Sequence, residues 1–197
     1  MRPKNRRPIT YAFVDSQNLN LGTQRMGWKL DWRKFRQYLF DKHGVTKAYM
    51  FIGYMSENEQ LYEYMHELGY LVVLKPTVDV STYNEPKEKT IGGVESSVGL
   101  TDKPVNDKEK PVVKGNVDAE LVLYAMKELP NYEMAILVSG DGDFFSLAEY
   151  LEEQGKLAHI LTPNWQYSSL LKTFDSKILR LDQMRRQLAY HDRKKNK

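Results

Sequence analysis

The residues best suited to chemistry lie in an acidic turn at 139–143, with the sequence Ser-Gly-Asp-Gly-Asp. The turn follows the apolar run 134–138, which predicts a buried strand, and it precedes residues 145–151, whose apolar spacing predicts an amphipathic helix. Open α/β sheets bind ligands at the C-terminal ends of their parallel strands. We therefore expect Asp141 and Asp143 in a functional site, although capping of the following helix is a structural alternative for Asp143.

Two further aspartates are expected at the same edge of the sheet. Asp15 follows a strand predicted for residues 9–14, and Asp118 lies at the start of a helix predicted for residues 117–129. Carboxylates gathered at one edge repel one another unless a cation lies among them, and oxygen-only ligands suit Mg²⁺ or Mn²⁺. Such an ion can activate water and stabilise the charge that develops on a phosphodiester. The pattern therefore predicts an acidic Mg²⁺ or Mn²⁺ site.

Alternating strands and helices are predicted around these residues. Further helices are expected at 31–42, 56–68 and 168–174, further strands at 47–53, 70–74, 157–161 and 177–181, and a loop at 22–27. Strand–helix–strand repeats imply parallel pairing with right-handed crossovers. We therefore predict an α/β protein with a mainly parallel central sheet of five or more strands, in which the strand beginning at Met134 is central and buried.

The chain of 197 residues favours one domain. We place this domain at 9–182, with a basic N-terminal tail at 1–8 and a basic C-terminal tail at 183–197. Residues 77–112 interrupt it as a polar insertion, because this span is poor in large apolar side chains and too long for an ordinary connection.

Composition excludes several classes of protein. The sequence has no cysteine, so disulfides and thiolate zinc sites are excluded and a cytoplasmic location is expected. No apolar stretch is long enough to span a membrane, and no apolar segment of the signal-peptide kind follows the basic start of the chain. We therefore expect no membrane partner.

Basic side chains gather at the two ends of the chain and leave the part between them acidic, although the formal net charge is only +3. The first end includes Arg6 and Arg7, and the second includes Arg185 and Arg186. Basic tails of this kind often contact nucleic acid through its phosphates. We expect these four arginines to bind nucleic acid, with a contribution to solubility as the alternative.

Three motifs occur together in the chain, at 13–19 (FVDSQNL), 114–121 (KGNVDAEL) and 139–144 (SGDGDF). Together with the strands and helices between them, they resemble the NYN domains, a branch of the PIN-like nucleases that includes the bacterial LabA-like proteins. The resemblance covers about residues 9–162. It implies a three-layer, Rossmann-like PIN/NYN fold, a divalent metal ion and cleavage of RNA.

The resemblance also implies the residues of the site. The implied catalytic residues are Asp15, Asn18, Asp118, Asp141 and Asp143, of which the four aspartates are the implied metal ligands. Lys114 and Ser139 lie where a phosphate could be held. The chain departs from the family at Tyr124, where many members have a second aspartate six residues after the position of Asp118.

The resulting prediction is a hydrolase, a metal-dependent endoribonuclease that cleaves RNA phosphodiester bonds at an acidic Mg²⁺ or Mn²⁺ site. The alternative is an RNA-binding or scaffold NYN protein in which catalysis is weak or lost. DNA stays open as a substrate, and a homo-oligomer or a protein partner stays open as an assembly.

Overall fold

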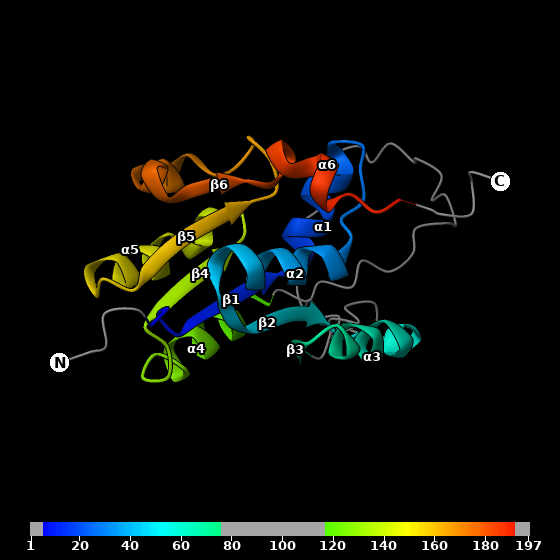
Figure 1. The fold of residues 1–197 in the computed structure, drawn as a ribbon, viewed down its shortest axis with the longest axis horizontal. Coiled ribbons are helices and arrows are strands. Elements are labelled where there is room, and N and C mark those ends of the chain that lie inside the picture. Colours follow the sequence, from blue (N-terminus) through cyan, green and yellow to red (C-terminus); the bar gives the residue numbers. More distant parts are fainter. Residues whose placement is uncertain (1–5, 76–116, 192–197) are drawn as a thin grey trace, which may run out of the picture.

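The computed structural model describes residues 6–75 and 117–191. Its strands are β1 (Thr10–Asp15), β2 (Val45–Gly53), β3 (Tyr70–Lys75), β4 (Met134–Val138), β5 (Leu157–Thr162) and β6 (Ile178–Arg180). They form one sheet in the order β3-β2-β1-β4-β5-β6, and every neighbouring pair is parallel (Figure 1). The prediction of a parallel α/β sheet with β4 inside it is confirmed.

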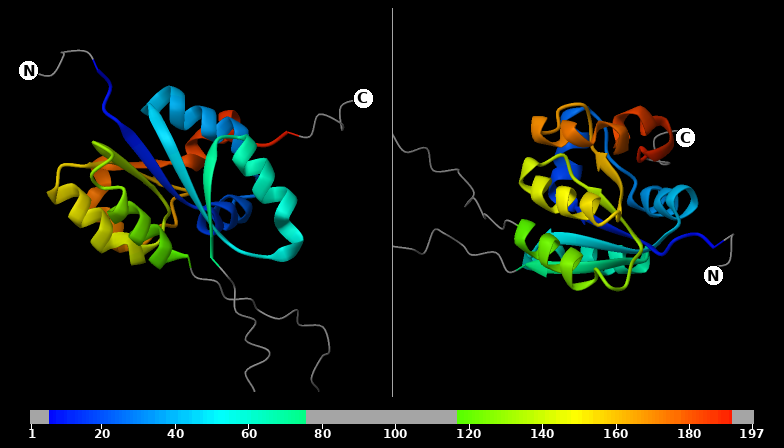
Figure 2. Two further views of the ribbon diagram at one scale, coloured as in Figure 1. Left: turned by 90° about the horizontal axis from the view of Figure 1, so that it is seen from below. Right: turned by 90° about the vertical axis from the view of Figure 1, so that its left-hand side faces the viewer.

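The helices form a layer on each face of the sheet. They are α1 (Ser16–Arg25), α2 (Trp32–His43), α3 (Glu59–Glu67), α4 (Asp118–Lys127), α5 (Phe145–Glu153) and α6 (Arg185–Leu188), with shorter 3₁₀ segments η1 (Ser56–Asn58), η3 (Gly142–Phe144), η4 (Ser169–Lys177) and η5 (Leu181–Met184). Helices α1, α2, α3 and α6 share one apolar core with the sheet, and α4 and α5 share the other (Figure 2). The alternation of side chains along β1 supplies both cores, because Val14 points into the first and Phe13 into the second.

Helix α1 is the element that the sequence pattern did not predict. The expected loop at 22–27 begins only after Arg25, because the helix continues through Gly22. A side chain at Gly22 would come within 2.4 Å of the Pro163 ring. Glycine therefore serves close packing here, and its weak helix propensity gave the wrong local prediction.

The packed part of the chain extends beyond the predicted domain end at 182. Leu188 and Ala189 are buried, and Ala189 forms an antiparallel bridge with Leu30. The basic tail predicted from 183 therefore begins with residues that pack against α2.

Several predictions lie outside the described residues. The polar insertion at 77–112 falls within residues 76–116, as does Lys114, and residues 1–5 and 192–197 of the two tails are also outside. Within the described ranges, no helix is long and apolar enough to cross a membrane.

Candidate functional site

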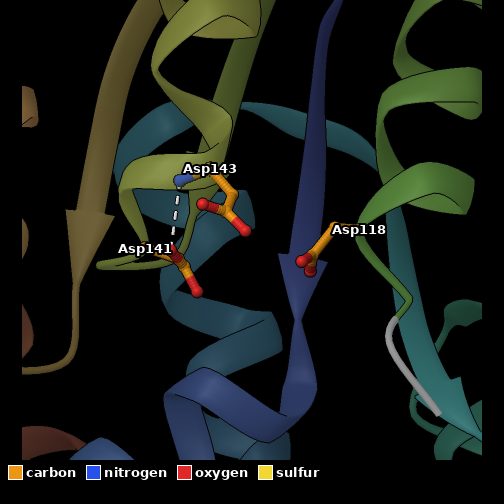
Figure 3. Close-up of side chains that lie close together, drawn as sticks. All are labelled: Asp118, Asp141 and Asp143. Atoms are coloured by element: carbon orange, nitrogen blue, oxygen red, sulfur yellow. Dashed lines mark hydrogen bonds between the residues drawn. The ribbon is translucent and has the colours of Figure 1, made fainter.

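Three carboxylates converge at the C-terminal edge of the sheet, and we call them the acidic cluster. Asp118 is the first residue of α4, Asp141 follows β4, and Asp143 lies in η3. One oxygen from each carboxylate lies within 4.8 Å of the other two. Figure 3 shows Asp118 facing the other two aspartates from the start of α4. Asp118 and Asp141 are half-buried and Asp143 is exposed, so the cluster is reachable from solvent.

Asp15 lies behind the acidic cluster as a buried anchor. Its side chain is 4% exposed; Oδ1 accepts a hydrogen bond from the Asn18 amide at 3.0 Å, and Oδ2 accepts one from the Ser139 hydroxyl at 3.1 Å. Burial raises the pKa of the Asp15 carboxyl, the two hydrogen bonds oppose that rise, and the negative charges of Asp118 and Asp141 add to it. The buried carboxylate thus joins the end of β1 to the turn after β4.

Ser139 and Asn18 hold the backbone of the acidic turn. The Ser139 hydroxyl accepts a hydrogen bond from the Asp141 amide at 3.1 Å, and Asn18 Oδ1 accepts one from the Gly140 amide at 2.9 Å. Ser139 is only 3% exposed. Its position therefore favours a structural role over the phosphate contact suggested by the sequence.

Asp141, and not Asp143, caps η3, the helical segment after the turn. Its Oδ1 accepts a hydrogen bond from the Asp143 amide at 3.1 Å, which makes Asp141 the N-cap of η3 (Figure 3). The structural alternative considered for Asp143 therefore applies to the other aspartate of the pair. A carboxylate has about four acceptor positions, so the cap leaves Asp141 able to bind a cation as well.

The donor set of the acidic cluster fits a hard divalent cation. It consists of oxygen atoms alone, it comes from two separate elements, and its like charges lie close together. Mg²⁺ and Mn²⁺ prefer such ligands and accept several water molecules in the remaining positions.

The four arginines expected to bind nucleic acid are not among the residues at the acidic cluster. Arg6 pairs with Glu133 at 3.1 Å, at the opposite end of β1 and β4, and Arg7 lies near Gly44 on the same side. Arg185 and Arg186 belong to α6, where the Arg185 guanidinium donates a hydrogen bond to the Gly27 carbonyl beyond α1.

A cavity of about 430 Å³ lies beside the first turns of α1. Its walls include Ser16, Asn20, Trp32 and Met65, and the lining residues within 6–75 and 117–191 include no aspartate, glutamate, lysine or arginine. The described carboxylates that are grouped closely enough to hold a metal ion therefore belong to the acidic cluster and not to this cavity.

Comparison with known proteins identifies the family. The NYN domain model matches residues 10–181, so the chain belongs to the NYN domain family. The chain is similar to the low amplitude and bright protein LabA of Synechococcus elongatus, with 26% identity over 162 residues, which are 78% of this chain and 73% of that protein. Since this family is a branch of the PIN-like nucleases, membership supports a nuclease or RNA-related function.

A solved structure confirms the fold. The crystal structure of a protein of unknown function from Vibrio parahaemolyticus RIMD 2210633 superposes with a TM-score of 0.64 over 95% of this chain and 100% of that chain. The two sequences are 19% identical, so this likeness shows the fold alone.

Tyr124 is half-buried and packs against the apolar core that α4 and α5 share with the sheet. Its ring lies 5.7 Å from the ring of Tyr49 and 5.8 Å from that of Phe51, and the Lys127 ammonium lies 5.0 Å from its centre. Tyr124, at the position where the resemblance implies a second aspartate, therefore packs α4 against β2.

Proposed function

We propose that the protein is a metal-dependent endoribonuclease that hydrolyses RNA phosphodiester bonds at the acidic cluster. The observation that carries the proposal is the convergence of Asp118, Asp141 and Asp143, whose oxygens lie within 4.8 Å of one another at the ligand-binding edge of a parallel sheet. RNA is proposed as the substrate because of the nuclease family, and the cysteine-free sequence suits the cytoplasm.

Each polar residue has a distinct role in this proposal. Asp118, Asp141 and Asp143 would hold Mg²⁺ or Mn²⁺, which when bound supplies an activated water and stabilises charge on the phosphate. Asp15 adds a fourth negative charge nearby and positions the turn through Ser139. Asn18 fixes the backbone of the turn without adding charge.

The test is cleavage of matched RNA and DNA oligonucleotides by the full chain with Mn²⁺, with Mg²⁺ and with EDTA. Asp141→Asn should slow metal-dependent cleavage at least about a hundredfold, roughly 2.7 kcal/mol of barrier. Glu153→Gln is the matched control, because Glu153 is an exposed carboxylate in the last turn of α5 and is not part of the cluster.

Three outcomes separate the candidates. Cleavage of RNA that EDTA abolishes supports the proposal, and equal cleavage of DNA would widen the substrate class. Cleavage that persists in EDTA or in Asp141→Asn contradicts it. Binding of RNA without any cleavage would favour an RNA-binding NYN protein, the reading to which Tyr124 points.

A further inference from the structure

The loop after β5 lies directly on the acidic turn. We call residues 163–168 the β5 loop. Its Ser168 amide donates a hydrogen bond to the Gly140 carbonyl at 2.9 Å. A side chain added at Gly142 would come within 2.4 Å of Ser168 Oγ, so loop and turn are in close contact. The β5 loop therefore borders the acidic turn that carries Asp141 and Asp143.

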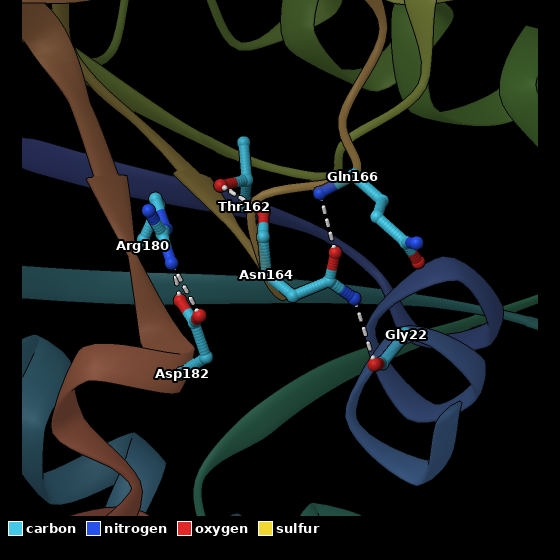
Figure 4. Close-up of polar contacts among 6 residues, drawn as sticks. All are labelled: Gly22, Thr162, Asn164, Gln166, Arg180 and Asp182. Atoms are coloured by element: carbon cyan, nitrogen blue, oxygen red, sulfur yellow. Dashed lines mark hydrogen bonds and ion pairs between the residues drawn. The ribbon is translucent and has the colours of Figure 1, made fainter. Parts of the chain in front are cut away.

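Hydrogen bonds hold the β5 loop in one conformation through Asn164, which is 3% exposed. Asn164 Nδ2 donates to the Gly22 carbonyl at 2.9 Å, and its Oδ1 accepts from the Gln166 amide at 2.7 Å (Figure 4). Its backbone carbonyl accepts from the Thr162 hydroxyl at 3.2 Å. The residue between Asn164 and Gln166 is thus held on both sides.

That residue is Trp165, and its side chain is 57% exposed. Single exposed apolar residues are common on protein surfaces, but tryptophan is usually well buried. This indole lies on a loop that is already ordered, so binding a partner costs little loop entropy. The feature that calls for explanation is an exposed indole on a loop that is fixed by hydrogen bonds and lies next to the acidic turn.

A small polar pocket of about 110 Å³ lies beside the same loop. It is lined by Asn18, Arg25, Gly140, Asn164 and Gln166, among others, and so shares Gly140 with the acidic turn. Among the described residues that line this pocket, Arg25 is the one cation; it is exposed and lies in the last turn of α1. The pocket is large enough to admit a phosphate group.

We propose that Trp165 is a stacking platform for a base of single-stranded RNA and that Arg25 contacts an adjoining phosphate, an inference that rests on the proposed function. Aromatic rings bind single strands by stacking on exposed base faces, with little sequence preference. A duplex offers no such faces, because its bases are stacked already. Arginine supplies the positive charge that a strand needs next to an acidic cluster.

The experiment measures binding without cleavage. Fluorescence anisotropy in EDTA follows a labelled RNA octamer of oligoadenylate and the same strand in a duplex. Trp165→Ala should raise Kd for the single strand about thirtyfold, which corresponds to the middle of the range of about 1–3 kcal/mol expected for loss of one stacked base. Trp165→Phe should remain within about threefold of the wild type, because it keeps an aromatic face.

The matched control is Phe40→Ala. Phe40 is 55% exposed in α2, which ends where β2 begins, at the edge of the sheet opposite the acidic cluster. This variant should bind as the wild type does. Octamers with one abasic position, moved along the strand, provide a second readout: at one position the effect of Trp165→Ala should disappear. Arg25→Ala should lower the slope of log K against log salt by about 0.7.

Unchanged binding by Trp165→Ala, equal losses for single strand and duplex, or no binding by the wild type would overturn the platform. A change in oligomeric state without a change in RNA binding would also overturn it and would mark Trp165 as a protein contact. The proposed hydrolysis can fail separately: if the wild type binds RNA through Trp165 but cleaves nothing, the stacking role of Trp165 stands and hydrolysis is refuted. If the wild type cleaves RNA but Trp165→Ala binds RNA as the wild type does, only the stacking role of Trp165 is refuted.

Discussion

Replacing Asp141 by asparagine should make the metal-free protein more stable, although it should inactivate the proposed enzyme. The substitution keeps the size of the side chain and an Oδ1 atom that can still accept the hydrogen bond from the Asp143 amide. It removes one of three negative charges whose oxygens lie within 4.8 Å of one another. Relief of repulsion is therefore the main change expected in the absence of metal.

The magnitude follows from Coulomb's law. At 4.8 Å, two unit charges repel by about 0.9 kcal/mol in water and by about 3.5 kcal/mol at an effective dielectric constant of 20. The lower figure applies here, because Asp143 is exposed and Asp141 is only half-buried. Relief from two neighbours amounts to about 1–2 kcal/mol, which corresponds to a rise in Tm of about 2–8 °C for a chain of this size.

The assay is thermal unfolding in EDTA, followed by circular dichroism at low and at high salt. The gain in Tm should shrink at high salt, because salt screens exposed charges. Mn²⁺ should raise the Tm of the wild type and have little effect on Asp141→Asn, since a ligand stabilises only the state that binds it. Glu153→Gln should follow the wild type throughout. A lower Tm for Asp141→Asn in EDTA, or an equal response to Mn²⁺, would refute the reasoning.

Three further predictions concern the frame of the fold. Ser139→Ala should lower the free energy of unfolding by about 1–3 kcal/mol, because it removes the donor to Oδ2 of the buried Asp15 and leaves only the Asn18 amide on Oδ1. Urea denaturation would measure this loss, and an unchanged free energy of unfolding would contradict that role. Gly22→Ala should cost about 1–3 kcal/mol by forcing Pro163 away, and weaker binding of single-stranded RNA should accompany it if the β5 loop contacts substrate. Burial and the charge of His159 lower the pKa of His43, so the folded protein binds fewer protons than the unfolded chain and loses stability as the pH falls below about 6.5. The Tm of His43→Gln should therefore fall less than the Tm of the wild type between about pH 7 and pH 5. An identical fall in Tm would contradict this.

The architecture was largely predictable because buried parallel strands are continuous apolar runs. The run at 134–138 was predicted as a central strand, and Asp15 and Asp141 were placed at the same edge because each follows such a run. The start of α4 at Asp118 was also predicted. These positions depend on local patterns and on the rules of parallel connection, which sequence reveals well.

The remaining features depend on contacts between segments far apart in the sequence. Gly22 is helical because it packs on Pro163, a reason that no local pattern contains. The hydrogen bonds around Asp15 form only because the end of β1 and the turn after β4 come close together. The sequence alone therefore could not show which of the predicted site residues face a cation and which only position the turn. The place of Trp165 beside the acidic turn likewise follows from the pairing of β4 and β5.

The dependence of the RNA cleavage rate on Mn²⁺ concentration tests the central claim most directly, with Mn²⁺ binding measured on the same preparation by isothermal titration calorimetry. The proposal predicts no cleavage in EDTA and a rate that saturates with Mn²⁺, with half-saturation at the Kd for binding. In Asp141→Asn, binding should weaken and the rate should fall at least about a hundredfold. Cleavage in EDTA, or a wild-type rate and Mn²⁺ affinity in Asp141→Asn, would contradict the assignment of catalysis to the acidic cluster.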